Sequence, residues 1–237
     1  MSESKPHDDA RARALMLSAS VAMALLAVLS AAVRGLGALD ADRAVLRFVS
    51  DGPGWLVALS QHCGSLALPA VAASSIAAVV AGAVVPRARR AALFVLSTVP
   101  VVMVLKWFLK LYATRSGPSR GSFDEFPSGH AAGTLALALV VRLLVPASWR
   151  ATVRALLLGL ALLVGFGLVV GRVHYATDIL GGWLLTLAWV PLVWLVLMRD
   201  RERGGTMASC RLLLSGLARA ISPVAADDPQ SRGTRTR

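Results

Sequence analysis

The sequence predicts an all-α membrane protein: a bundle of six transmembrane helices, with one amphipathic helix at the membrane interface after the first span. Hydrophobic residues make up 56% of the 237 residues and charged residues only 16%, so a water-soluble domain of this size would expose too much apolar surface. The apolar residues also gather in six runs of spanning length, with basic residues clustered at the run ends.

The six expected spans are the apolar runs of the sequence. They cover residues 14–34, 65–86, 91–112, 129–146, 154–172 and 178–198. The first run lacks a clear small-residue cleavage site, so we expect a retained helix rather than a signal peptide. Between the first two spans, residues 39–61 mix charged and apolar side chains, which predicts an amphipathic helix lying on the membrane surface.

The two ends of the chain have a polar composition. Residues 1–12 are expected to form a disordered cytoplasmic tail, and residues 13–200 the six-helix membrane domain. Residues 201–237 are expected to form a second cytoplasmic tail, amphipathic over 207–221 and then disordered.

Arginines in the short loops predict the orientation. They lie between spans two and three, between spans four and five, and after span six: Arg87, Arg89, Arg90, Arg150, Arg154, Arg199, Arg201 and Arg203. Because cytoplasmic loops are enriched in Lys and Arg, we expect these loops and both termini in the cytoplasm. The net charge of +12 then reflects membrane topology, and no nucleic-acid partner is expected.

The string Pro127-Ser128-Gly129-His130 immediately precedes an apolar run. Backbone N–H groups at a helix N-terminus bind anions, so the amides of Ser128 and Gly129 are candidates to seat one. The alternative is a plain N-cap, in which Pro127 turns the chain and Ser128 caps the helix.

His174 and Asp178, four residues apart, form the second candidate group. The carboxylate can accept the Nδ1 proton and leave Nε2 as a nucleophile, while His130 supplies an acid or base. A purely structural pair and a metal half-site are the alternatives. No metal is expected, because His7 lies in the tail and His62 in the surface segment.

Lys110 and Arg115 precede the loop that leads to His130, and we expect them to clamp a phosphate; surface anchoring is the alternative. Lys106 is expected only to snorkel to the interface. Gly181 and Gly182, one turn beyond Asp178, are expected to permit close helix packing.

These motifs resemble those of the type 2 phosphatidic acid phosphatase (PAP2) superfamily of integral membrane lipid phosphatases, over about residues 40–198. The family pattern is a lysine, six residues and Arg-Pro; then Pro-Ser-Gly-His; then Ser-Arg, five residues, a histidine, three residues and an aspartate. The second motif is complete in 127–130, and the third is complete at its catalytic end, in His174 and Asp178.

The chain departs from this pattern at two arginines. Gly117 stands where the first motif has arginine, with Arg115 or Arg120 as the replacement. Leu168 stands at the arginine of the third motif. Arg172 is expected to replace it, because on a helix it would return to nearly the same face one turn later.

The resemblance implies a metal-independent phosphatase without cofactor, acting on a membrane lipid phosphate or diphosphate in a bacterial inner membrane, with its site on the extracytoplasmic side. His174 would attack phosphorus to form a phosphohistidine, Asp178 would orient it, and His130 would act as acid and then base. The groups expected to hold the phosphate oxygens are Lys110, Arg115, Arg172 and the amides of Ser128 and Gly129. Polyprenyl diphosphate is the favoured substrate. A lipid headgroup phosphotransferase and a non-catalytic lipid-binding protein are the alternatives.

Overall fold

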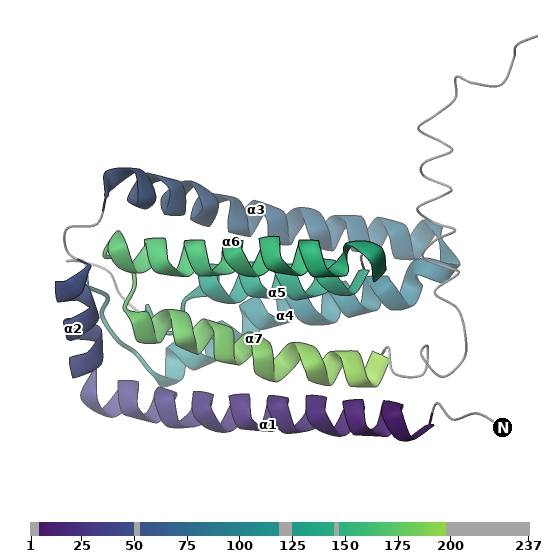
Figure 1. Cartoon of the computed structure of the whole chain (residues 1–237), viewed down its shortest axis with the longest axis horizontal. Coiled ribbons are helices and arrows are strands. Elements are labelled where there is room, and N and C mark those ends of the chain that lie inside the picture. The colour runs from purple at the N-terminus through teal and green to yellow at the C-terminus, as the bar shows by residue number, and fades with distance from the viewer. Residues whose placement is uncertain (1–4, 50–52, 119–124, 145–146, 198–237) are drawn as a thin grey trace, which may run out of the picture. The chain divides into compact units, whose positions relative to one another are not determined.

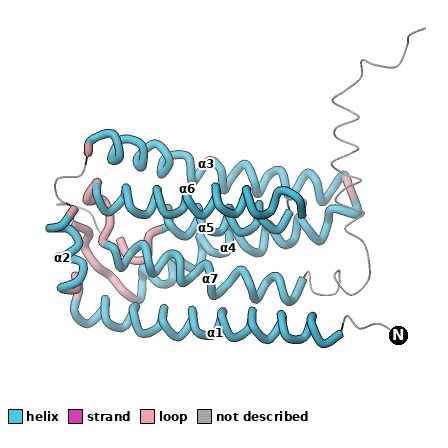
Figure 2. The backbone as a smooth tube through the Cα atoms, viewed as in Figure 1, coloured by secondary structure: helices cyan, strands magenta, loops and turns pink. Residues whose placement is uncertain are grey.

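The computed structural model describes residues 5–49, 53–118, 125–144 and 147–197, and within these every regular element is a helix (Figure 2). The all-α prediction is therefore confirmed for this part of the chain. The elements are α1 (Lys5–Leu36), α2 (Asp40–Phe48), α3 (Gly54–Val84), η1 (Pro86–Ala88), α4 (Arg89–Tyr112), α5 (Gly129–Leu144), η2 (Ala147–Trp149), α6 (Arg150–Val170) and α7 (Ala176–Leu197). The expected tail at 201–237 lies outside the described residues.

Four of the described helices are long and apolar enough to cross a bilayer: α1 over Asp9–Leu36, α4, α6 over Ala151–Val170, and α7. Two more helices carry shorter apolar stretches, Pro69–Val84 of α3 and Gly129–Arg142 of α5. The length and composition of these helices are those of a membrane protein.

Two expected boundaries are wrong. Residues 5–12 are not disordered, because α1 begins at Lys5; acidic residues near a helix N-terminus complement the macrodipole, and the alanines that follow are strong helix formers. The amphipathic helix is confined to α2, at 40–48. Residues 54–61 belong instead to α3, which starts directly after its N-cap residue Pro53.

The packing brings both motif-bearing loops to one end of the bundle, the end where α2 lies (Figure 1). The long helices from α3 to α7 alternate in direction, so α4 and α6 end there while α5 and α7 begin there. Helix α5 is central, since it packs against α3, α4, α6 and α7, whereas α1 packs mainly on α7. The segments around His130 and His174 therefore start neighbouring helices at the same end.

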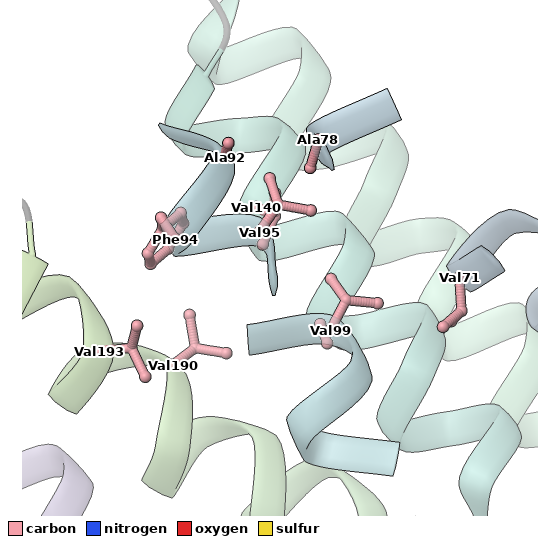
Figure 3. Packing of buried hydrophobic residues seen from close by; sticks show 10 residues of the cluster. Val71, Ala78, Ala92, Phe94, Val95, Val99, Val140, Val190 and Val193 are labelled. Atoms are coloured by element: carbon pink, nitrogen blue, oxygen red, sulfur yellow. The ribbon is translucent and has the colours of Figure 1, made fainter. Parts of the chain in front are cut away.

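Away from the α2 end, the core joins α3, α4, α5 and α7. Figure 3 shows this cluster, with Phe94 of α4 fully buried among valines and alanines from the four helices. Its ring meets that of Trp194 edge to face, at 5.6 Å between centroids. The Trp189 Nε1–H donates to the Ser97 carbonyl at 2.7 Å, which ties α7 to α4.

Small residues bring α7 close to α5, as helix association in a membrane favours. A Cβ on Gly182 would lie 2.5 Å from the Ser128 carbonyl oxygen and 3.0 Å from the Ala132 nitrogen, and one on Gly181 would overlap the Phe126 ring. One turn further along α7, the Thr186 hydroxyl donates to the Ala132 carbonyl at 3.0 Å. The prediction that Gly181 and Gly182 permit close packing is confirmed.

We predict that Gly182→Ala will destabilise the protein, because the methyl group meets backbone atoms that cannot rotate away. Overpacking of this kind costs about 1–3 kcal/mol. The matched control is Gly159→Ala in α6, where an added Cβ meets nothing within 4 Å. Thermal unfolding in detergent should show a lowered midpoint for the first variant and an unchanged or raised one for the second; equal midpoints would contradict the packing.

Candidate active site

The start of α7 is fixed by a turn that positions Asp178. The amides of Val173 and His174 both donate to the Leu168 carbonyl, at 3.0 and 3.2 Å, and α7 begins at Ala176. Asp178, at the third helical position, accepts the Tyr175 N–H through Oδ2 at 2.8 Å. This return contact is half of a capping box. It holds a fully buried carboxylate directly beside His174.

The structure brings His174 and Asp178 together, although not through spacing along one helix, because His174 lies before α7. The His174 Nδ1 atom is 3.6 Å from Asp178 Oδ2 and 3.1 Å from Glu125 Oε2. Among the described residues, neither oxygen has hydrogen-bond geometry toward Nδ1. Two carboxylates thus flank the imidazole, and Glu125 was not singled out in the sequence. Its place five residues before His130 was the available signal.

The N-terminus of α5 combines a cap with a bridge to α7. The Ser128 Oγ accepts the Ala131 N–H at 3.4 Å, as an N-cap residue does. The Ser128 N–H donates to the Asp178 carbonyl at 2.9 Å. The expectation that this amide faces an anion is therefore wrong, because its hydrogen is already bonded to α7.

His130 is the second residue of α5, and its half-buried ring lies near that of His174. The two ring centroids are 6.2 Å apart, with 59° between the planes. Since Nδ1 of His174 lies between Glu125 and Asp178, its Nε2 is on the side of the ring away from these carboxylates. Both predicted catalytic histidines thus belong to one cluster.

Lys106 and Lys110 lie one turn apart on α4, and both are half-buried. Both are close enough to His130 to act on it electrostatically, as is His174. The Lys106 amine occupies the space over Gly129 that a Cβ would fill. The prediction that Lys106 only snorkels to the interface is wrong. Its four-residue spacing from Lys110 was the signal that the two share a helix face.

Arg115 is buried and bonded to protein groups rather than directed to an open pocket. Its Nη1 donates to Asp42 Oδ2 at 3.0 Å and to the Gly37 carbonyl at 3.3 Å. Its Nη2 donates to the Thr177 hydroxyl at 2.9 Å and also pairs with Asp178 Oδ1. The guanidinium lies 4.7 Å from the centroid of the Tyr175 ring. Arg115 therefore joins α2 to the start of α7.

The positions where the chain departs from the family pattern have different surroundings. Leu168 is buried in an apolar cluster with Val164 and Ile179. Arg172 is exposed and has a left-handed backbone, with φ 55°. The helical argument for Arg172 is wrong, because α6 ends at Val170. Arg120 lies outside the described residues.

The fold and this cluster define a class: a helical membrane protein with two histidines and an aspartate gathered at one end of its bundle. The sequence profile of the PAP2 superfamily matches residues 52–202. The chain belongs to that superfamily, as its motifs predicted. The comparison with curated proteins gave no match.

One solved structure shows the same fold. It is the first transmembrane PAP2 type phosphatidylglycerolphosphate phosphatase from Bacillus subtilis, with a TM-score of 0.60 and 19% sequence identity. The match covers 80% of this chain and 98% of that one. At this identity the likeness extends to the fold alone.

We predict that Arg115→Gln will strongly destabilise the protein, because it leaves Asp42 and Asp178 as buried carboxylates without their shared cation. Removing one partner of a buried pair costs about 3–5 kcal/mol. Arg43→Gln is the matched control, since Arg43 pairs with Asp40 at the exposed surface of α2 and such pairs contribute about 0–1 kcal/mol. Unfolding in mixed micelles measures both; a loss no larger than that of the control would contradict a structural role for Arg115.

Proposed function

We propose that this protein is a metal-independent lipid phosphate phosphatase that acts through a phosphohistidine at the extracytoplasmic membrane interface. The observation that carries the proposal is the pairing of His130 and His174, with ring centroids 6.2 Å apart, beside Asp178 and within the field of two lysines. Membership of the PAP2 superfamily supports the same chemistry.

In the proposed first step, the lone pair of His174 Nε2 attacks phosphorus and an N–P bond forms as the P–O bond to the lipid breaks. Protonated His130 gives its proton to the departing oxygen. Asp178 stays ionised, accepts a hydrogen bond from the Nδ1–H of His174 and balances the positive charge that develops on the ring. In the second step, His130 takes a proton from water, the water oxygen bonds to phosphorus, the N–P bond breaks, and inorganic phosphate leaves.

The phosphate oxygens are proposed to bind the ammonium groups of Lys106 and Lys110 and the amides of Gly129 and His130, with Arg172 contributing from the rim. The electrostatics support an anion here. The N-terminus of α5 carries a partial positive charge, and the Lys106 amine lies directly over it. A phosphate bound beside both groups would convert this repulsion into attraction.

We also propose that the chain crosses the membrane six times and that α2 lies at the interface. Helix α5 has 16 residues and rises only about 24 Å, less than the roughly 30 Å of a hydrocarbon core. Its N-terminus would therefore lie just below the membrane surface. The arginines near α3–α4 and α5–α6 lie at the opposite end of the bundle, which we assign to the cytoplasm with both termini.

The proposed substrate is an amphiphile whose chains stay in the leaflet while its phosphate reaches this site. Polyprenyl diphosphate, phosphatidate, phosphatidylglycerol phosphate and a lipid A phosphate share this chemistry. The Bacillus subtilis protein of the same fold is named for phosphatidylglycerolphosphate, so this lipid belongs in the test panel beside polyprenyl diphosphate. A bacterial inner membrane is the proposed location.

We predict that purified protein releases inorganic phosphate from at least one lipid of this panel, and that His174→Ala lowers the rate by about 10³-fold or more because the nucleophile is lost. His130→Ala should slow both steps and make the phosphohistidine longer lived. Its lifetime is measured as radiolabel on the protein that is labile in acid and stable in base. His62→Ala, at an exposed position of α3, is the control.

The same assay separates the alternatives. Phosphate transfer that requires an added acceptor lipid would favour the phosphotransferase. Binding of every lipid phosphate without turnover would favour the non-catalytic protein and refute the proposal.

We also predict full activity after removal of divalent metal ions. Lysine ammonium groups and helix amides are proposed to neutralise the phosphate, so no metal is needed for that step. Turnover should be the same in excess EDTA and after readdition of magnesium, with a magnesium-dependent phosphatase as the positive control for chelation. Activity that is lost in EDTA and restored by metal would contradict this mechanism.

A further inference from the structure

Asp42 lies in α2, ten residues before the segment matched by the superfamily profile begins at residue 52. Its side chain is nevertheless fully buried and bonded to the start of α7. We propose that Asp42 is a positioning residue of the active site, which holds Arg115 and the first turn of α7 so that Asp178 is aligned and charged for its action on His174. This inference rests on the proposed function.

Four donors meet the Asp42 carboxylate. Oδ1 accepts the Thr177 N–H at 3.0 Å. Oδ2 accepts the Thr177 hydroxyl at 2.7 Å, Arg115 Nη1 at 3.0 Å and the Leu39 N–H at 3.3 Å. A helix that only lies on a membrane needs no such group, and burying a charge is costly unless it is fully bonded. Asp40, two residues earlier on the same helix, is exposed instead.

The bond to the Thr177 N–H supplies a cap to α7 from another helix. Thr177 is the second residue of α7, and its N–H has no partner within the helix. Caps of this kind contribute typically about 1 kcal/mol. Here the cap also fixes the turn in which Asp178 reaches back to the Tyr175 N–H, so Asp42 sets the direction of the Asp178 side chain.

The bond to Arg115 sets the charge around Asp178. Arg115 pairs with Asp42 through one terminal nitrogen and with Asp178 through the other, so the three groups together carry one net negative charge. That charge faces His174, whose ring becomes positive when Nε2 attacks phosphorus. If Asp42 were neutral, Arg115 would balance Asp178 alone, and the charge developing on His174 would keep only Glu125 as its counter-charge. Such a loss acts on the transition state and lowers kcat more than it changes KM.

The test compares Asp42→Asn with Asp40→Asn, a matched change at an exposed position of the same helix. Both are assayed in mixed micelles on short-chain phosphatidate, phosphatidylglycerol phosphate and farnesyl diphosphate, using whichever the wild type hydrolyses fastest. In metal centres, loss of a group that orients a ligand costs about 10- to 100-fold in activity, and we expect a fall in kcat on this scale for Asp42→Asn with KM unchanged. Vanadate inhibition should weaken in parallel, and Asp40→Asn should match wild type.

A second variant tests the inference if Asp42→Asn does not fold. Thr177→Val keeps the ion pairs but removes the hydroxyl that bridges Asp42 and Arg115, and we expect a smaller fall in kcat with the same unchanged KM. In an Asp178→Asn background, Asp42→Asn should not lower the rate of phosphoenzyme formation any further. If Asp42 had only a structural role, the second substitution would lower this rate again.

The outcomes separate the two proposals. If wild type hydrolyses none of the lipids, the proposed function fails and the inference fails with it. If wild type is active but a folded Asp42→Asn protein matches Asp40→Asn, only the inference is overturned. Where Asp42→Asn does not fold, an unchanged kcat in Thr177→Val overturns it, and a reduced kcat with unchanged KM supports it.

Discussion

The α2 end of the bundle depends on the ion pairs of Arg115. Its side chain lies between the first turns of α2 and α7, whose buried carboxylates would otherwise repel each other. Asp42 and Asp178 each occupy the third position of their helix and each accept the N–H of their own N-cap residue. Both carboxylates are fully buried. The guanidinium of Arg115 pairs with both through its two terminal nitrogens, which offsets their repulsion in a low-dielectric site. Arg115 thus helps to fix both the position of α2 and the direction of the Asp178 side chain.

The second constraint is the distance between α5 and α7. Gly182 lets α7 approach the backbone at the start of α5, and Gly181 leaves room for the ring of Phe126, just before α5. This approach brings His130, at the start of α5, beside His174, which precedes α7. Helix packing positions both histidines, because His130 lies in the first turn of α5 and His174 lies just before α7. A site built on helix ends inherits its precision from the helix packing.

The sequence was sufficient for features carried by local pattern and insufficient for those that depend on which helices become neighbours. Apolar runs predicted the helices, and the family-like motifs predicted that His130, His174 and Asp178 lie together. Asp42 falls within residues 39–61, whose pattern predicts a surface helix, because nothing in these residues indicates that α2 packs on α7. Arg115 was assigned to the substrate because a cation next to a predicted phosphate site has that role by default. Its carboxylate partners, 73 and 63 residues away, become visible only in three dimensions.

The hydrogen bond from the Ser128 N–H to the Asp178 carbonyl has a consequence for how the site tolerates change. It joins the two motifs main chain to main chain, so no side chain carries it. Alanine scanning cannot detect this bond, because alanine keeps the backbone N–H. An ester in place of the Ser128 amide would remove this bond alone. The contact between the two helix starts at this point is therefore made by the backbone of Ser128 and Asp178 and not by their side chains.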